Sequence, residues 1–271
     1  MRAAIIFSTL LWLSCSEKPA DRFTYTFGKK QHILETGKGQ PVVLFISGFG
    51  DRVSSWMSVQ KQIAGVTRTF SYDRAGLGES EMISKDRSLD SMLFELNELL
   101  RVEKIAPPYI LVGHSYGGHI ARYFAHKHPD KVVGLVLIDA TVEHMHDEFK
   151  RIKTVEEIRK YDSLMEHGRD PNWKEGVRNE SDYFSVNNEK MKGLPFNPAI
   201  PTTVITAMKT PESSFDFLKG ANEIKVALHK RWASEYPHIR HVYANKSGHY
   251  VQFDEPELVI SEVLNLVGRN K

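Results

Sequence analysis

Hydrophobic and polar positions along the chain alternate between short apolar runs and longer amphipathic segments. The run "PVVLFIS" at 41–47 is rich in β-branched residues and has the length of a buried strand. The segment 89–103 instead repeats leucine at helical spacing, with Leu93, Leu96 and Leu100 on one stripe. Runs of these two kinds follow one another along most of the chain. This alternation predicts an α/β fold with a mostly parallel sheet wrapped by helices.

The pattern yields eight predicted strands and several predicted helices. The strands are expected at 22–27, 32–35, 41–47, 67–73, 109–112, 132–138, 202–208 and 238–243. The helices are expected at 54–64, 89–103, 119–125 and 255–267. Short turns between elements of these kinds are typical of a single layered α/β domain.

The segment 141–198, here called the cap segment, interrupts this alternation. It is charged, helical in its first part and without a strand pattern. An insertion at the carboxyl edge of a parallel sheet lies above the place where such folds bind ligands. We therefore expect a helical cap that helps to form the substrate pocket. The alternative is a surface decoration that packs its apolar face on the core.

Composition sets the size of the domain and argues against one class of partner. The chain has 271 residues, of which 41% are hydrophobic, which is enough for one large domain, predicted at 22–271. The formal net charge is only +2, and no basic stripe runs along any predicted helix. Nucleic acid is therefore not expected as a partner.

The N-terminus has the pattern of an export signal. Arg2 precedes an apolar run, 3–13, that is too short to span a bilayer, as in secretory signal peptides. The run leads to Cys15, and this end resembles a bacterial lipoprotein signal, in which a cysteine receives lipid after cleavage. We predict a signal peptide at 1–14, a tether at 15–21 and a protein anchored to a bacterial membrane through Cys15. An ordinary signal peptide, giving a periplasmic or secreted protein, is the alternative.

Ser115 lies in an abrupt change from strand to helix pattern, "YILVGHSYGGHIARYFA" at 109–125. Gly113 and Gly117 flank it in a Gly-x-Ser-x-Gly motif, which in this context places the serine at the exposed apex of a sharp turn. The backbone N–H of Tyr116 would lie near the helix N-terminus, where it can bind developing negative charge. Ser115 is thus a candidate nucleophile, or else only a turn residue.

A serine nucleophile needs a base within hydrogen-bonding reach and an acid that orients this base. His249 lies in "NKSGHYVQFDEPELV", after the last predicted strand and before the final helix. Nucleophile, acid and histidine follow in this order in one common arrangement of the triad. His249 is therefore the candidate base.

Four stretches together resemble the α/β-hydrolase superfamily. They are "LFISGFG", "SYDRAGLGES", "LVGHSYGGHIARYFA" and "SGHYVQFDEPE". The resemblance implies an α/β-hydrolase fold, with an eight-stranded, mostly parallel sheet. It also implies that Gly48-Phe49-Gly50 forms the second half of an oxyanion hole through the Phe49 N–H. Dehalogenases and epoxide hydrolases of this fold have aspartate at the nucleophile position, whereas Ser115 implies an acyl-enzyme.

The acid of the triad has two possible locations, because members of the superfamily place it after either of two strands. After 202–208 the usual aspartate position is occupied by Thr210 and a proline, which leaves Glu212 and Asp216 as shifted candidates. Asp139 directly follows the strand at 132–138. We favour Asp139 as the acid, with Glu212 as the alternative. If Glu212 is the acid, Asp139 has only a structural role.

The expected activity follows from these residues. The sequence predicts a serine hydrolase of carboxylesterase type that acts on a small or medium acyl ester and needs no cofactor. His144 and His146 have no neighbouring acid or cysteine pattern of a metal site, and "GFGDRV" lacks the third glycine of a dinucleotide fingerprint. The alternatives are cleavage of a thioester, amide, lactone or carbon–carbon bond, or a ligand-binding receptor of this fold with little turnover.

Overall fold

The computed structural model describes residues 20–167, 171–210 and 220–270. The predicted signal peptide with Cys15, and the alternative acids Glu212 and Asp216, lie outside the described residues. Within the described ranges, no helix is long and apolar enough to cross a membrane.

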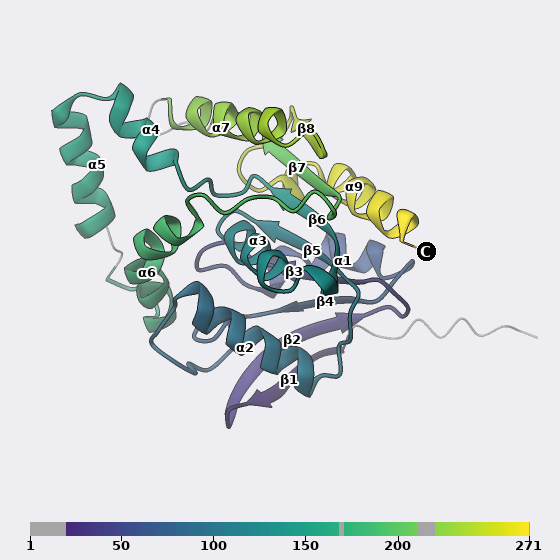
Figure 1. The fold of residues 1–271 in the computed structure, drawn as a ribbon. Helices are drawn as coiled ribbons and strands as arrows, with labels where there is room; N and C mark the ends of the chain where they lie inside the picture. Colours follow the sequence, from purple (N-terminus) through teal and green to yellow (C-terminus); the bar gives the residue numbers. More distant parts are fainter. Residues whose placement is uncertain (1–19, 168–170, 211–219, 271) are drawn as a thin grey trace, which may run out of the picture.

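One eight-stranded sheet organises the chain (Figure 1). Its strands are β1 (Ala20–Thr26), β2 (Lys29–Thr36), β3 (Val42–Ile46), β4 (Thr69–Tyr72), β5 (Tyr109–His114), β6 (Val132–Ile138), β7 (Thr202–Ala207) and β8 (Ile239–Ala244). The spatial order is β1-β2-β4-β3-β5-β6-β7-β8. Strand β2 runs antiparallel to β1 and β4, and every other neighbouring pair is parallel. The predicted eight-stranded, mostly parallel sheet is confirmed.

Helices cover both faces of the sheet. They are α1 (Met57–Ile63), α2 (Leu89–Val102), α3 (Gly117–Lys127), α4 (Met145–Ile152), α5 (Val155–His167), α6 (Glu175–Met191), α7 (Ala221–Glu235), α8 (Val251–Asp254) and α9 (Pro256–Arg269). The inner strands bury both of their faces: in β3, Val42 and Leu44 pack with α2 and α3, while Val43 and Phe45 pack with α1 and α9. Because alternate side chains of a strand point to opposite faces, one continuous apolar run fills two core layers.

Helix α7 is absent from the predicted elements. Its buried residues include Ile224, Leu228 and Trp232, which recur every four residues. This spacing is the signal in the sequence that indicates the helix. The omission matters for function, because α7 carries a charged side chain to the candidate site.

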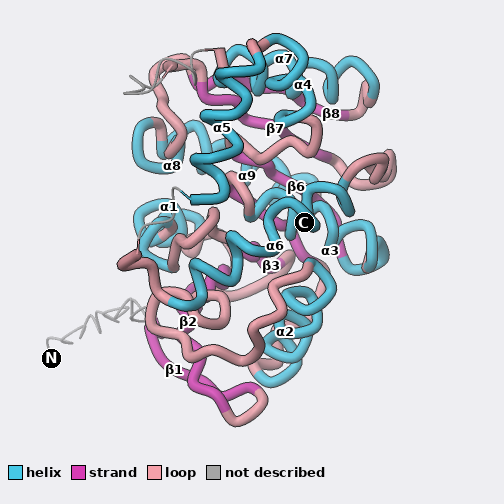
Figure 2. The backbone as a smooth tube through the Cα atoms, turned by 90° about the vertical axis from the view of Figure 1, so that its left-hand side faces the viewer, coloured by secondary structure: helices cyan, strands magenta, loops and turns pink. Residues whose placement is uncertain are grey.

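Helices α4, α5 and α6 come from the cap segment and lie between β6 and β7 in the chain. In Figure 1 they occupy the side toward which the arrowheads of β5 and β7 point, the carboxyl edge of the sheet. Figure 2 views the molecule from that side, with α5 and α6 in front of the sheet. Helix α6 approaches the turn after β4 closely: a Cβ placed on Gly176 would lie 2.2 Å from the carbonyl oxygen of Gly76.

Candidate active site

Ser115 occupies a sharp turn between β5 and α3. Its φ is +52°, in the left-handed region that non-glycine residues rarely adopt. Its N–H donates to the carbonyl oxygen of Ile138 at 3.0 Å, and its own carbonyl accepts from Gly118 and Thr141 at 2.9 and 3.1 Å. Gly117 crosses β3 so closely that a Cβ there would lie 2.1 Å from the Ile46 carbonyl oxygen. Both the strain and this close approach match the sharp turn expected from the Gly-x-Ser-x-Gly motif.

His249 lies in the loop between β8 and α8, beside the histidine that precedes Ser115. The Nε2 of His114 is 2.9 Å from the carbonyl oxygen of His249, and the two ring centroids are 4.7 Å apart. Burial, together with the charge of a protonated His249, lowers the pKa of His114 to about 3. A neutral His114 can donate one hydrogen bond, and it uses this bond to hold the His249 backbone next to the Ser115 turn.

Asp139 follows β6 and faces His249. Its Oδ2 is 2.7 Å from Nδ1 of His249, and its Oδ1 accepts from the backbone N–H of Ala207 at 3.0 Å. The side chain is fully buried, and φ at Asp139 is +42°. Burial alone would raise the pKa of this carboxyl group. The hydrogen bond from His249 and the positive charge of Lys225 outweigh burial and lower this pKa to about 2. Asp139 is therefore ionised and can accept a hydrogen bond from His249.

The loop Gly48-Phe49-Gly50 lies against the Ser115 turn. A Cβ placed on Gly48 would be 3.3 Å from the Cβ of Ser115 and 3.1 Å from Nδ1 of His114, so the loop approaches the turn closely. Tyr116, the residue after the candidate nucleophile, is buried at the start of α3. The two predicted donors, the backbone N–H groups of Phe49 and Tyr116, thus belong to segments that flank Ser115.

A buried ion pair connects this loop to the cap segment, and the sequence analysis did not find it. Arg74, after β4, donates to the carbonyl oxygens of Ser47 and Gly48, both at 2.6 Å. Its guanidinium also pairs with Glu180 of α6, with Nε to Oε1 at 2.6 Å and Nη2 to Oε2 at 3.0 Å. Glu180 in turn accepts from the Gly50 N–H at 3.1 Å. Burial disfavours the charged guanidinium, but the Glu180 carboxylate more than compensates and leaves the pKa of Arg74 raised.

Aromatic side chains from the cap segment approach the same loop. The Phe49 ring contacts Trp173 and Phe184, with centroids 5.7 and 6.4 Å apart. Phe184 also packs on Tyr116 at 5.2 Å. These contacts give the candidate site an apolar wall made of core and cap residues together.

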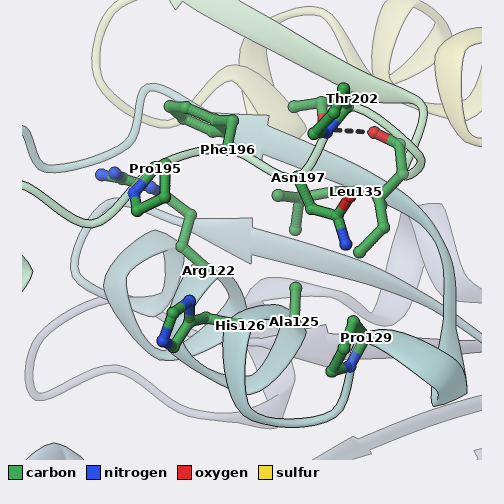
Figure 3. Close-up of a pocket in the computed structure, with 11 residues that line it drawn as sticks. Arg122, Ala125, His126, Pro129, Leu135, Pro195, Phe196, Asn197 and Thr202 are labelled. Carbon is green, nitrogen blue, oxygen red and sulfur yellow. Dashed lines mark hydrogen bonds between the residues drawn. The ribbon is translucent and has the colours of Figure 1, made fainter.

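A separate cavity of about 330 Å³ lies at the opposite edge of the sheet (Figure 3). It is lined by the C-terminal part of α3 and by the segment that leads into β7, including Phe196 and Thr202. Arg122 borders it, but this side chain is paired with Glu143 at 2.7 Å. Since Ser115 and Asp139 follow the carboxyl ends of β5 and β6, this cavity is distinct from the candidate active site.

In the part of the chain that the structure describes, no three metal-ligating side chains gather in a geometry suited to a metal ion. His144 and His146, which the sequence indicates to be surface histidines, lie 3.6 and 3.2 Å from carboxylate oxygens of Asp147 and Asp162.

Comparison with known proteins agrees with this architecture. Residues 41–165 match the profile of the family described as alpha/beta hydrolase fold. An AB hydrolase superfamily protein of Gibberella zeae is 28% identical over 279 residues, covering 84% of this chain and 86% of that protein. The protein YqjL of Bacillus subtilis is 34% identical over 103 residues, covering 38% of this chain and 41% of that protein.

Solved structures share the fold over almost the whole chain. A thermophilic esterase from Thermogutta terrifontis superposes with a TM-score of 0.63 at 21% identity, covering 91% of this chain and 96% of that one. The Cif epoxide hydrolase from Acinetobacter nosocomialis gives a TM-score of 0.66 at 16% identity, covering 90% and 88%. The protein therefore has the α/β-hydrolase fold, with an eight-stranded, mostly parallel sheet and flanking helices.

Proposed function

We propose that this protein is a serine hydrolase that cleaves a small or medium acyl ester through an acyl-enzyme intermediate. One observation carries the proposal: Asp139 hydrogen-bonds His249, whose loop is held beside the strained turn of Ser115. A nucleophilic triad consists of a carboxylate, an imidazole and a serine. All three groups are present at one edge of this sheet.

Each residue has a chemical role in this mechanism. The Oγ of Ser115 attacks the ester carbonyl carbon while His249 Nε2 removes the hydroxyl proton. Asp139 accepts from Nδ1–H, which fixes the tautomer with a free Nε2 and stabilises the imidazolium that forms. His249 then gives the proton to the departing alcohol, and in the second half it activates the water that releases the acid.

Negative charge develops on the carbonyl oxygen in both halves of the reaction. The backbone N–H groups of Phe49 and Tyr116 are the proposed donors to this oxygen. Arg74 and Glu180 hold the Phe49 loop through its carbonyl oxygens and the Gly50 N–H. Donors that are fixed before the substrate binds need no reorganisation when the charge appears.

The substrate class rests on the surroundings of Phe49. Trp173 and Phe184 place apolar rings beside it, so an uncharged acyl group with an apolar body fits better than a charged one. A cofactor has no role in this mechanism, since every step uses the side chains and water.

The proposal is tested with a fluorophosphonate probe and a panel of p-nitrophenyl esters of graded chain length. Ser115→Ala should abolish labelling and lower kcat about a million-fold, while exposed Ser54→Ala should behave like the wild type. A Ser115→Ala protein that keeps a tenth of the activity would disprove the nucleophile.

The same measurements separate the other candidate functions. Turnover of thioesters, amides or lactones but not esters, still lost in Ser115→Ala, would change the substrate class and keep the mechanism. A folded wild-type protein with neither labelling nor turnover would instead favour a binding protein of this fold.

A further inference from the structure

Lys225 of α7 contacts the same carboxylate oxygen as the candidate base. Its Nζ is 2.6 Å from Oδ2 of Asp139, and this oxygen also lies 2.7 Å from Nδ1 of His249. The other oxygen, Oδ1, is bonded to the backbone of Ala207. The Lys225 side chain is only 14% exposed, and its carboxylate partner is completely buried. Asp139 is therefore shared between an ammonium group and an imidazole.

The packing of α7 against the core sets the position of Lys225. It lies next to Ile224, which belongs to the buried stripe of α7. One turn further on, His229 donates from Nε2 to the carbonyl oxygen of Ala140 at 2.9 Å. Its Nδ1 is bonded to the hydroxyl group of Thr206 at 2.8 Å. These bonds fix α7 to the residue after Asp139.

The ammonium group changes the charge balance of the dyad. An ionised Asp139 and a neutral His249 would carry one net negative charge, which favours protonation of the imidazole. With Lys225 added, the cluster is neutral before protonation and positive after it. A like charge nearby disfavours the protonated form of a base. Lys225 therefore opposes protonation of His249.

None of the other titratable groups that the structure describes around the dyad replaces this effect. His114 of β5 packs on the His249 ring, and His229 of α7 lies behind Asp139; burial lowers their pKa values to about 3 and about 4. Both are neutral in mildly acidic solution. His241 of β8, bonded to Thr206, also has a pKa lowered by burial, and burial raises the pKa of Tyr250. Among the described side chains, Lys225 is the cation that contacts Asp139.

We propose that Lys225 is a positioning residue for the triad, whose pairing with Asp139 disfavours protonation of His249 and so favours activity as the pH falls. The inference rests on the proposed function of the triad. Lys225 touches neither the substrate nor Ser115 in this mechanism. It acts through the carboxylate, by holding it ionised and by sharing its charge.

The test compares three lysine variants in the full chain. Lys225→Met removes the charge, Lys225→Arg keeps it, and Lys230→Met removes an exposed charge from the same helix. The value of kcat/KM for a p-nitrophenyl ester and the rate of fluorophosphonate labelling are measured from pH 4 to 8. We expect the midpoint of the rise with pH to move upward by about one unit in Lys225→Met, and to stay unchanged in Lys225→Arg and Lys230→Met. At acid pH this shift corresponds to about a ten-fold loss of rate.

Lys225→Gln is a fourth variant, which can still donate a hydrogen bond to Asp139 but carries no charge. The same upward shift in this variant identifies the charge, rather than the hydrogen bond, as the cause. An unshifted midpoint in folded Lys225→Met and Lys225→Gln would overturn the inference.

The readout does not depend on turnover alone. The titration of the His249 imidazole, followed by NMR, should move upward in Lys225→Met as the rate profile does. A wild type without turnover would contradict the proposed function, and the NMR shift would still decide the role of Lys225. Equal imidazole titrations in wild type and Lys225→Met would disprove that role.

Discussion

The Nδ1 of His249 lies 2.7 Å from Oδ2 of Asp139, a residue 110 positions earlier in the chain. The sheet produces this contact, because β6, β7 and β8 are adjacent parallel strands whose carboxyl ends meet at one edge. Asp139 ends the first of these strands, and His249 follows the third. The alternative acids Glu212 and Asp216, which follow β7 in the chain, lie outside the described residues.

Asp139→Asn should lower kcat about ten-thousand-fold with little change in KM. The amide keeps the shape of the side chain but cannot stabilise the imidazolium. Steady-state kinetics on one ester would measure this loss, with Glu212→Gln and Asp216→Asn as companion variants. Near-normal kcat in Asp139→Asn, together with a large loss in Glu212→Gln, would place the acid after β7.

Acid should destabilise the fold through its buried histidines. Burial lowers the pKa of His114 to about 3 and those of His119 and His229 to about 4, from an ordinary value of 6.5. At pH values between the lowered pKa values and 6.5, the unfolded chain binds more protons than the folded one. The free energy of unfolding should therefore fall as the pH drops from about 6.5 toward 4, by up to about 1.4 kcal/mol per histidine and pH unit.

Urea denaturation at pH 7, 6 and 5 measures this pH dependence. His119→Gln should make the slope shallower, because one buried imidazole is gone. Exposed His126→Gln serves as the control and should leave the slope unchanged. Equal unfolding midpoints at pH 7 and pH 5 would contradict the prediction.

Glu180→Gln should affect both stability and catalysis. It leaves the buried guanidinium of Arg74 without its counter-charge, which costs about 3–5 kcal/mol when one partner of such a pair is removed. It also loosens the loop that carries the proposed Phe49 donor, so kcat should fall more than KM rises. Glu189→Gln on the same helix loses only an exposed ion pair with Lys192, and its effect should stay below about 1 kcal/mol. Unchanged kcat in a folded Glu180→Gln would refute the positioning role.

Gly176→Ala should weaken the docking of α6 on the core. The added methyl group would lie 2.2 Å from the carbonyl oxygen of Gly76, a backbone atom that cannot move aside easily. We expect a loss of about 1–3 kcal/mol, as for other overpacked sites, and a lower kcat. Gly268→Ala in α9 meets nothing within 4 Å and should be neutral or stabilising. Similar melting temperatures for the two variants would count against this tight contact.

The sequence by itself determined the parts of this protein that depend on neighbouring residues. Short strand-like runs predicted all eight strands, and the runs of β3, β5 and β6 are the most continuously apolar because these inner strands are buried on both faces. The glycines around Ser115 predicted the sharp turn, because only they permit the close approach of β5, α3 and β3. The place of His249, between the last strand and the final helix, could be read in the same way.

Only the tertiary structure decided which distant side chains meet. The sequence favoured Asp139 as the acid without showing that this residue meets His249, and it gave no reason to connect Arg74 with Glu180 or Lys225 with Asp139. These pairs join residues 106 and 86 positions apart. No local sequence pattern identifies the partner of a charged side chain. Strand order and helix packing bring the two together, and burial then makes their pairing necessary, since an unpaired buried charge is too costly to keep.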